Sequence, residues 1–452
     1  MNSDGFIDPT GLSALDAQRA LREGRMSAED LVAACLARIR ADEDRVRAWA
    51  YLDPDYALAQ ARKADLARTE GGPVGPLHGI PVGIKDIIDT YDMPTENGTV
   101  LHAGRRPERD ATVVSRLREA GAIILGKTVT TELATYAPGK TRNPHNPEHT
   151  PGGSSSGSAA AVAAHMVPLA LGTQTNGSVI RPAAYCGVYG YKPTYGLISR
   201  HGILKQSPPL DQVGVIARSI EDVALLAEVL IGYDENDRAT RAAAHPQLLR
   251  IAAEDPPVPP SLAFVKTPIW DQTENQTREA LAELIECLGE HAEEFTLSAR
   301  YAVAWDWHKK IMEAEIARNY QRDYERGRQQ LSESLRGQIE RGRAVTAVDY
   351  NTAVDGIDAL NLALEEVFFS FDAIITPATA GTAPKGLDST GSPAFCTLWT
   401  LCGMPAITLP LLQGDDGLPL GVQLVGKRGD DARLLRTARW LVRTVREADG
   451  SD

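Results

Sequence analysis

Residues 151–193 read PGGSSSGSAAAVAAHMVPLALGTQTNGSVIRPAAYCGVYGYKP, and this stretch decides how the chain is understood. Serines and glycines come first, an alanine-rich run at 159–164 predicts a helix, and the apolar run at 167–171 predicts a strand. A second turn rich in glycine and serine follows at 172–178. A flexible linker would explain the first serines and glycines, but not their direct continuation into a helix and a strand. The stretch therefore predicts a functional site rather than a spacer.

This stretch resembles the signature of the amidase signature family, serine hydrolases that act on amides. The resemblance also covers Gly79–Asp89 (GIPVGIKDIID) and Thr131–Ser156, and it returns at Gly403–Gly426, so it spans most of the chain. It implies an α/β fold with a large mixed β-sheet core covered by helices on both sides. It implies no metal and no organic cofactor.

The resemblance implies a catalytic triad in which Ser178 is the nucleophile, Ser154 the bridging serine beside a cis peptide, and Lys85 the base. A serine at neutral pH needs such a base within hydrogen-bond reach, and a Ser–Lys pair is a known variant of this logic. On local sequence alone, Lys85 would be an ordinary lysine at the end of a strand. Partial burial there would lower its pKa and allow it to act as a neutral base.

The turn before the nucleophile is expected to supply an oxyanion hole. The backbone N–H groups of Thr175, Asn176, Gly177 and Ser178 follow one another there and can converge on a developing negative charge. The family usually has glycine where Asn176 stands. Asparagine tolerates positive φ better than other non-glycine residues, so we expect the turn to persist.

Three residues are expected to contact the substrate, namely Tyr136, Gly153 and Gln174. The aromatic ring of Tyr136 equally fits a packing role. Family members often have an acidic residue at the position of Gln174. They also commonly place an arginine two residues after the nucleophile, whereas Arg181 here comes three residues after it, which leaves its role open.

Two alternative sites in this region are not favoured. Gly153–Gly157 matches G-x-S-x-G with Ser155 at its centre, but the preceding residues are turn-like, and the elbow of α/β-hydrolases requires a strand there. His145 and His149 invite a metal site, yet no third ligand follows at a suitable spacing.

The rest of the chain predicts alternating helices and strands. Ser27 and Asp30 form a capping pattern for a helix over 27–40. The other predicted helices lie at 55–68, 110–120, 219–231, within 301–369, and at 430–446. The predicted strands lie at 77–89, 122–126, 187–192, 213–218, 371–376, 405–411 and 420–425. We expect a single domain over 1–452, with a helical N-terminal segment to about residue 75 and a variable, mostly helical substrate-side segment at about 235–370.

Composition narrows the class of protein. The net charge of the 452 residues is −13 without long basic runs, which argues against nucleic acid or an anionic membrane as a partner. Five cysteines without a CxxC pair fit a reducing compartment. The N-terminus lacks a signal-peptide pattern, and no apolar run approaches the ~18 residues of a membrane span. These features predict a cytoplasmic protein.

The leading functional hypothesis is an amidase that acts on a small-molecule amide or carbamate (urethane), with esters as further substrates, in the form of a homodimer that the resemblance implies. An alternative is the glutaminase (A) subunit of a tRNA-dependent amidotransferase, which works in a complex; Gln174 and Asn176 replace residues typical of its nucleophile turn. A third hypothesis, an inactive binding homologue, is disfavoured because Lys85, Ser154 and Ser178 are all present.

Overall fold

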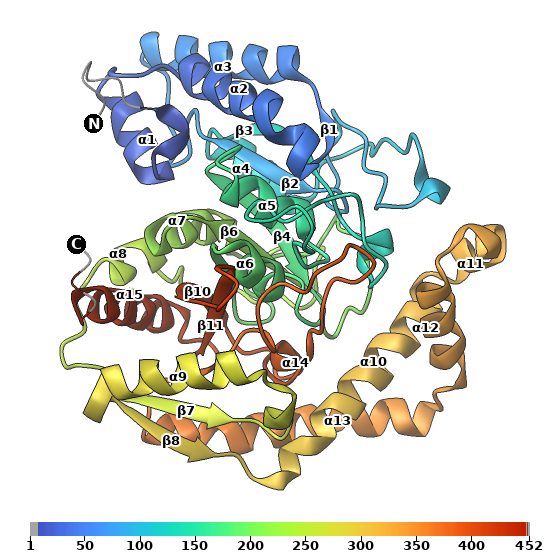
Figure 1. The fold of residues 1–452 in the computed structure, drawn as a ribbon. Helices are drawn as coiled ribbons and strands as arrows, with labels where there is room; N and C mark the ends of the chain where they lie inside the picture. Colours follow the sequence, from blue (N-terminus) through green and yellow to red (C-terminus); the bar gives the residue numbers. More distant parts are fainter. Residues whose placement is uncertain (1–7, 449, 451–452) are drawn as a thin grey trace.

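The structure, a computed structural model, describes residues 8–448 and 450. Its centre is one mixed sheet of 11 strands in the order β1-β3-β2-β4-β6-β5-β10-β11-β9-β7-β8. The strands are β1 (Trp49–Leu52), β2 (Pro81–Lys85), β3 (Ile123–Thr128), β4 (Leu169–Gln174), β5 (Tyr189–Lys192), β6 (Gln212–Ala217), β7 (Leu262–Lys266), β8 (Ala292–Thr296), β9 (Ala373–Pro377), β10 (Ala406–Gln413) and β11 (Pro419–Val425). Helices pack around this sheet, which confirms the expected α/β fold (Figure 1).

The helices of the described chain alternate with these strands and then dominate the region before β9. They are α1 (Ala14–Arg22), α2 (Ala28–Val46), α3 (Pro54–Thr69), α4 (Thr112–Glu119), α5 (Ser156–Ala163), α6 (Ile180–Cys186), α7 (Ile220–Leu230), α8 (Leu248–Ala252), α9 (Asn275–Leu288), α10 (Val303–Asn319), α11 (Gln321–Gly327), α12 (Glu333–Ala344), α13 (Ala347–Glu365), α14 (Ala394–Leu401) and α15 (Asp431–Ala448). Helices α10 to α13 pack on one another as a helical layer beside the sheet (Figure 1). None of the helices described here is long and apolar enough to cross a membrane.

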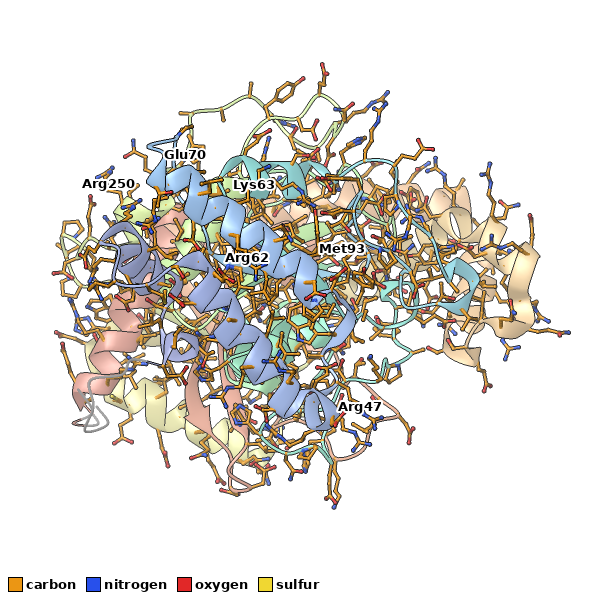
Figure 2. All side chains as sticks on the ribbon, turned by 90° about the horizontal axis from the view of Figure 1, so that it is seen from above. Arg47, Arg62, Lys63, Glu70, Met93 and Arg250 are labelled. Carbon is orange, nitrogen blue, oxygen red and sulfur yellow. The ribbon has the colours of Figure 1, made fainter. Side chains whose placement is uncertain are left out.

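The N-terminal helices form as the sequence predicts. Ser27 caps α2 in a full capping box, because its side chain accepts from the N–H of Asp30 and the Asp30 carboxylate accepts from the N–H of Ser27. Figure 2 shows α2 and α3 side by side, with Arg47 at the end of α2 and Arg62 and Lys63 on α3. Their apolar sides join the main core, so this pair covers the part of the sheet that contains β3.

The structure also contains strands that the sequence pattern did not predict. β1 is short, and β8 has mostly exposed or half-buried side chains at the edge of the sheet, so neither shows a strong apolar alternation. β7 and β8 both fall within 235–370, the segment expected to be mostly helical. They pair in parallel with each other, and β7 pairs in parallel with β9, so this segment extends the same sheet.

The centre of the sheet positions the site. β2 lies between β3 and β4 and runs parallel to both, and every residue of β2 and β4 is buried. Because the carboxyl ends of parallel neighbours meet at one edge, the last residue of β2, Lys85, lies near the turn that follows β4. The segment before α5 and the segment before α6 reach the same edge, and they carry Ser154 and Ser178.

Candidate active site

Lys85 is fully buried at the end of β2, and its amine is aimed at two hydroxyl groups. Nζ donates to Ser154 Oγ at 2.7 Å and to Thr173 Oγ1 at 2.8 Å. Burial holds the pKa of the Lys85 ammonium well below its usual value, while the carboxylate of Asp211 acts more weakly in the opposite direction. A lysine held in this way favours the neutral amine. A neutral amine next to a hydroxyl can accept the proton of that hydroxyl.

Ser154 lies on a segment that another buried cation holds in place. The peptide bond between Gly153 and Ser154 is cis, and the chain enters α5 two residues later. Arg181, on α6, donates to the carbonyl oxygen of Gly153 from Nη2 at 2.7 Å and from Nε at 3.3 Å, and it also donates to the carbonyl of Gly391. Arg181, whose role the sequence left open, therefore fixes the peptide unit that precedes Ser154.

Ser178 lies on the turn between β4 and α6, next to the segment of Ser154. The backbone N–H of Ser155 donates to the carbonyl of Ser178 at 3.2 Å, which joins the two serine-bearing segments. Within residues 8–448, the hydroxyl of Ser178 makes no hydrogen bond, and the residue keeps 9% of its surface exposed. The structure thus places the segment of Ser178 beside that of Ser154, whose hydroxyl is bonded to Lys85, and it leaves the Ser178 hydroxyl without a hydrogen bond.

The turn before Ser178 presents unused backbone donors. The N–H groups of Thr175, Asn176, Gly177 and Ser178 find no acceptor within the described chain, whereas those of the next residues, Val179 onwards, are bonded. Neither Asn176 nor Gly177 has a positive φ, so the tolerance of asparagine for that conformation is not needed. A Cβ on Gly177 would instead lie 3.0 Å from Pro393 Cβ, so glycine serves close packing here.

Asn176 ties the turn to a neighbouring helix. Its side-chain oxygen accepts from Thr397 at 2.8 Å, and its backbone carbonyl accepts from Thr400, both on α14. Its side-chain nitrogen donates to the hydroxyl of Tyr136 at 3.4 Å. The side chain that replaces the usual glycine therefore links α14 to the loop of Tyr136.

Gln174 and Gly153 are both buried beside the nucleophile turn. The Gln174 side chain accepts from the N–H groups of Val179 and Ile180 at 2.8 and 3.0 Å, and it donates to Thr400 at 2.9 Å. Its amide oxygen thus holds the start of α6 and its amide nitrogen bonds α14, which favours a structural role over the expected substrate contact. Gly153 is buried among threonine methyl groups, while Tyr136 is half-buried with its ring near Asn176.

His308 joins the site from α10, a contact that the sequence analysis missed. Its Nε2 donates to the carbonyl of Thr175 at 2.9 Å, and burial lowers the pKa of its imidazole to about 4, so the ring is neutral near pH 7. On the other side of the same residue, the Thr175 hydroxyl donates to the carboxylate of Asp211 at 2.7 Å. A lone histidine within a charged helical stretch carries no local signal of such a contact.

The two alternative sites do not form. Ser155 is fully buried, and its hydroxyl is bonded to the backbone of Thr173 on both sides. The ring nitrogens of His145 and His149 each bond a backbone carbonyl. In the part of the chain that the structure describes, no group of three or more metal-ligating side chains is close enough to hold an ion.

The sequence matches a known family over most of its length. The amidase family model matches residues 30–435, and the chain therefore belongs to the amidase family. The A subunit of glutamyl-tRNA(Gln) amidotransferase from Chloroflexus aurantiacus is 36% identical, with 94% of this chain and 95% of the relative covered. Its counterpart from Symbiobacterium thermophilum is 36% identical, with 96% of each covered.

Solved structures agree with this family. The peptide amidase of Stenotrophomonas maltophilia has a TM-score of 0.84 at 29% identity and covers 96% of this chain and 97% of its own. A 6-aminohexanoate cyclic dimer hydrolase bound to substrate has a TM-score of 0.84 at 26% identity, with 98% of both chains covered. The chain therefore shares nearly all of its fold with a peptide amidase and with a cyclic dimer hydrolase.

These relatives correct one expectation from the sequence. A small-molecule substrate, no nucleic acid, and at most a homodimer were expected, but the curated relatives above are named as one component of an amidotransferase for glutamyl-tRNA(Gln). The exclusion of nucleic acid rested on the net charge of −13 without long basic runs. The charge of a single chain gives no information about contacts that other members of an assembly make, so this inference was wrong.

Proposed function

We propose that this chain hydrolyses a carboxamide through an acyl-enzyme on Ser178, with Ser154 and Lys85 as its proton relay. The observation that carries the proposal is the 2.7 Å hydrogen bond between Lys85 Nζ and Ser154 Oγ, made by a lysine whose pKa burial keeps low. The free N–H groups of the turn support it, because they lie where a developing oxyanion needs donors. An inactive binding homologue would not need a neutral buried lysine beside a hydroxyl.

In the first half of the reaction, Ser178 Oγ forms a bond to the carbonyl carbon. Its proton passes to Ser154 Oγ, while the proton of Ser154 passes to the neutral amine of Lys85. The carbonyl oxygen becomes negatively charged and is bound by the N–H groups of the turn. The carbon–nitrogen bond then breaks, and the proton returns through Ser154 to the departing nitrogen, which leaves as an amine.

In the second half, water takes the place of the amine. It gives its proton to the same relay as its oxygen bonds to the acyl carbon, and the ester bond to Ser178 breaks. The relay returns the proton to Ser178 Oγ, and the carboxylic acid leaves. Carbamates and esters form the same kind of acyl-enzyme, so we propose them as further substrates of the same site.

We propose one catalytic unit over the chain, supported by the single sheet that joins its strands. Strands from β1 at residue 49 to β11 at residue 425 belong to that sheet, and its neighbouring strands β2 and β4 lead to Lys85 and to the turn of Ser178. We also propose a cytoplasmic location, supported by five free cysteines, four of them buried.

The test is covalent labelling with a fluorophosphonate, followed by mass spectrometry of the modified peptide. The label is expected on Ser178, and Ser178→Ala is expected to lose both labelling and amide hydrolysis while remaining folded. Ser155→Ala is a matched control, because it removes a hydroxyl from a neighbouring serine that the relay does not use. A label on Ser155, or full activity in Ser178→Ala, would overturn the proposal.

A second candidate is glutamine hydrolysis within an amidotransferase, and the curated relatives favour it. It uses the same acyl-enzyme chemistry but requires partner subunits and a charged tRNA. One experiment separates the two candidates by measuring the release of ammonia from glutamine. The chain is assayed alone and then together with the other subunits of an amidotransferase and glutamyl-tRNA. An increase in ammonia release that requires both the subunits and the tRNA supports the second candidate. No effect of these additions, together with hydrolysis of other amides, supports the first candidate.

A further inference from the structure

Asp211 lies immediately before β6, next to the turn that carries the expected oxyanion donors. Because β4 and β6 pair antiparallel with Gln174 opposite Gln212, the residue before β6 faces the residue after β4. Across this end of the pair, the hydroxyl of Thr175 donates to Asp211 Oδ1 at 2.7 Å, which is closer than Gln206 Oε1 at 3.1 Å. The strand pairing therefore places a carboxylate against the first of the expected donor residues.

The carboxylate of Asp211 is itself held in place by the backbone. Oδ2 accepts from the N–H groups of Gln206 and Ser207 at 3.0 and 2.9 Å, and the N–H of Asp211 donates to the carbonyl of Ser207 at 2.8 Å. Arg200 donates to the backbone carbonyl of Asp211 at 3.2 Å. Burial raises the pKa of this carboxyl, while the hydrogen bonds to it act in the opposite direction, because each of them favours the ionised form.

The same carboxylate lies a short step along the chain from the proposed base. Lys85 donates to the hydroxyl of Thr173, and Thr175 comes two residues later, roughly 7 Å along an extended chain. Thr173, Thr175 and Asp211 line one cavity of about 310 Å³, so all three border the same space. Among the described residues, no carboxylate lies within ion-pair distance of Lys85, and Asp211 is the one whose charge opposes the effect of burial on the Lys85 pKa.

We propose that Asp211 is a positioning residue for the reaction at Ser178 and that it acts in two ways. Its bond to Thr175 fixes the start of the oxyanion turn, and its charge stabilises the ammonium that Lys85 becomes when it takes the proton of Ser154. The inference rests on the proposed function. Asp211 neither gains nor loses a proton in this step. The buried base therefore becomes positive near a fixed negative charge, which lowers the cost of burying that ammonium.

Other titratable groups around Asp211 and Lys85 do not replace this charge. Two carboxylates are already paired, in the ion pairs Asp86–Lys127 and Asp237–Arg200. Burial keeps three further groups neutral near pH 7, because it lowers the pKa of an imidazole and raises the pKa of two phenols, namely His308, Tyr195 and Tyr320. The exposed titratable groups that line the cavity are His201, Lys205 and Arg238.

The test follows the rate at which a fluorophosphonate labels Ser178 as the pH is raised. This reaction needs the base but no known substrate, and its fluoride leaves without a proton, so the rate reports the activation of Ser178. Thr175→Val removes the bond and keeps the charge of Asp211. We expect it to lower the rate about 10- to 100-fold at every pH, because a misplaced group near the reacting atoms has effects of this size.

Asp211→Asn removes the charge and keeps a side-chain partner for Thr175. Without the nearby negative charge Lys85 loses its proton more readily, so the rise in labelling rate should move to lower pH. The plateau should also fall, because a weaker base accepts the proton of a hydroxyl less readily. A purely structural role for Asp211 would lower the rate but would leave the rise at the same pH.

Asp222→Asn is the matched control. The fully buried Asp222 carboxylate also accepts from two backbone N–H groups, at 2.9 and 3.0 Å, but it lies in α7, beyond the far end of β6. We expect this variant to keep the rate and the pH profile of the wild type once thermal unfolding has established its folded fraction. His201→Gln, which removes an exposed imidazole from the cavity, should keep the same profile.

The outcomes separate this inference from the proposed function. If Ser178 of the wild type is labelled, an unmoved rise in Asp211→Asn, or the same shift in Asp222→Asn, overturns the role of the charge. The wild-type rate in Thr175→Val overturns the support of the turn. If Asp211→Asn does not fold, Thr175→Val decides together with Thr175→Ser, which returns the hydroxyl and should recover the rate. Absence of labelling in the wild type overturns the proposed function and this inference together.

Discussion

Arg181 Nη2 donates to the carbonyl oxygen of Gly153 at 2.7 Å, and this bond couples the two serine-bearing segments. Arg181 belongs to α6, which begins directly after the turn of Ser178, while Gly153 immediately precedes Ser154. The guanidinium is buried and has no carboxylate within ion-pair distance in residues 8–448, and burial lowers its pKa. A charge held only by carbonyl oxygens is costly, so we assign Arg181 a positioning role for Ser154.

Replacement of Arg181 should therefore affect the rate more than substrate binding. We expect Arg181→Met to lower kcat for amide hydrolysis by about 100-fold with little change in KM, because small misplacements of a reacting group have effects of this size. Arg181→Lys should recover only part of the rate, since an ammonium lacks the forked geometry of a guanidinium. Steady-state kinetics, with thermal unfolding to correct for the folded fraction, check this. Wild-type kcat in folded Arg181→Met would contradict the assignment.

His308 offers a second test, because it holds the turn from α10. His308→Ala leaves the carbonyl of Thr175 without its partner, and we expect a loss of about 1–3 kcal/mol of stability together with a lower kcat. His308→Gln places an amide nitrogen near the position of Nε2 and should retain most of both. Chemical denaturation and kinetics on the two variants check this. Equal stability and equal kcat in His308→Ala and His308→Gln would show that the hydrogen bond to Thr175 contributes to neither.

The lowered pKa of His308 makes the stability of the protein depend on pH. Its pKa is lowered to about 4 by burial, so between that value and the ordinary pKa of about 6.5 the unfolded chain binds more protons than the folded one. Stability should therefore fall as the pH falls through this window, by up to about 3 kcal/mol from this group. His308→Gln should show a smaller fall. The unfolding free energies of the wild type and His308→Gln are measured at pH 4.5 and at pH 7. The same loss of stability between the two pH values in both proteins would show that His308 does not contribute to it.

The core of the site could be predicted because its residues lie in short, recognisable stretches. Ser154 and Ser178 fall within one continuous segment, and Lys85 ends an alternating apolar strand whose neighbour, β4, belongs to that segment. The chain geometry of parallel neighbours then brings them to one edge. Local sequence and sheet topology agree here, and for that reason the sequence could predict that the side chains of Lys85 and Ser154 meet.

The roles of the supporting residues depend on packing between distant segments. His308 meets Thr175 across 133 positions of the chain, and Gln174 meets Thr400 across 226. No periodicity reveals such contacts. Gln174 shows the difficulty, because its position beside the nucleophile turn suggested a substrate contact, whereas its amide group is used within the protein. Sequence position places a residue near a site, but the direction of its side chain follows from packing.

Metal removal gives a further prediction. The proposed relay needs only side chains, and His145 and His149 are each bonded to a backbone carbonyl. We expect amide hydrolysis to retain its full rate after dialysis against EDTA. Loss of turnover that a single divalent metal restores would contradict the proposed relay as a sufficient mechanism.

The sharpest prediction concerns Lys85 and the leaving group. Amide cleavage expels an amine that must be protonated as it departs, whereas an activated aryl ester expels a phenolate that leaves without a proton. Lys85→Ala should slow both reactions, because it removes the base that activates Ser178, but it should slow amide hydrolysis more. An amide and an aryl ester with the same acyl group make the comparison, since differences in acyl binding largely cancel.

The pH profile adds a signature that loss of structure would not produce. Lys85 acts as a base only when neutral, so kcat/KM for the amide in the wild type should rise with pH through the lowered pKa of this lysine and then level off. In Lys85→Ala that rise should disappear, and only slow attack by unassisted Ser178 should remain. Lys85→Met is a matched control for packing, because it keeps most of the buried volume and removes the amine. If either variant retains the rise, or loses ester hydrolysis more than amide hydrolysis, Lys85 is not the base.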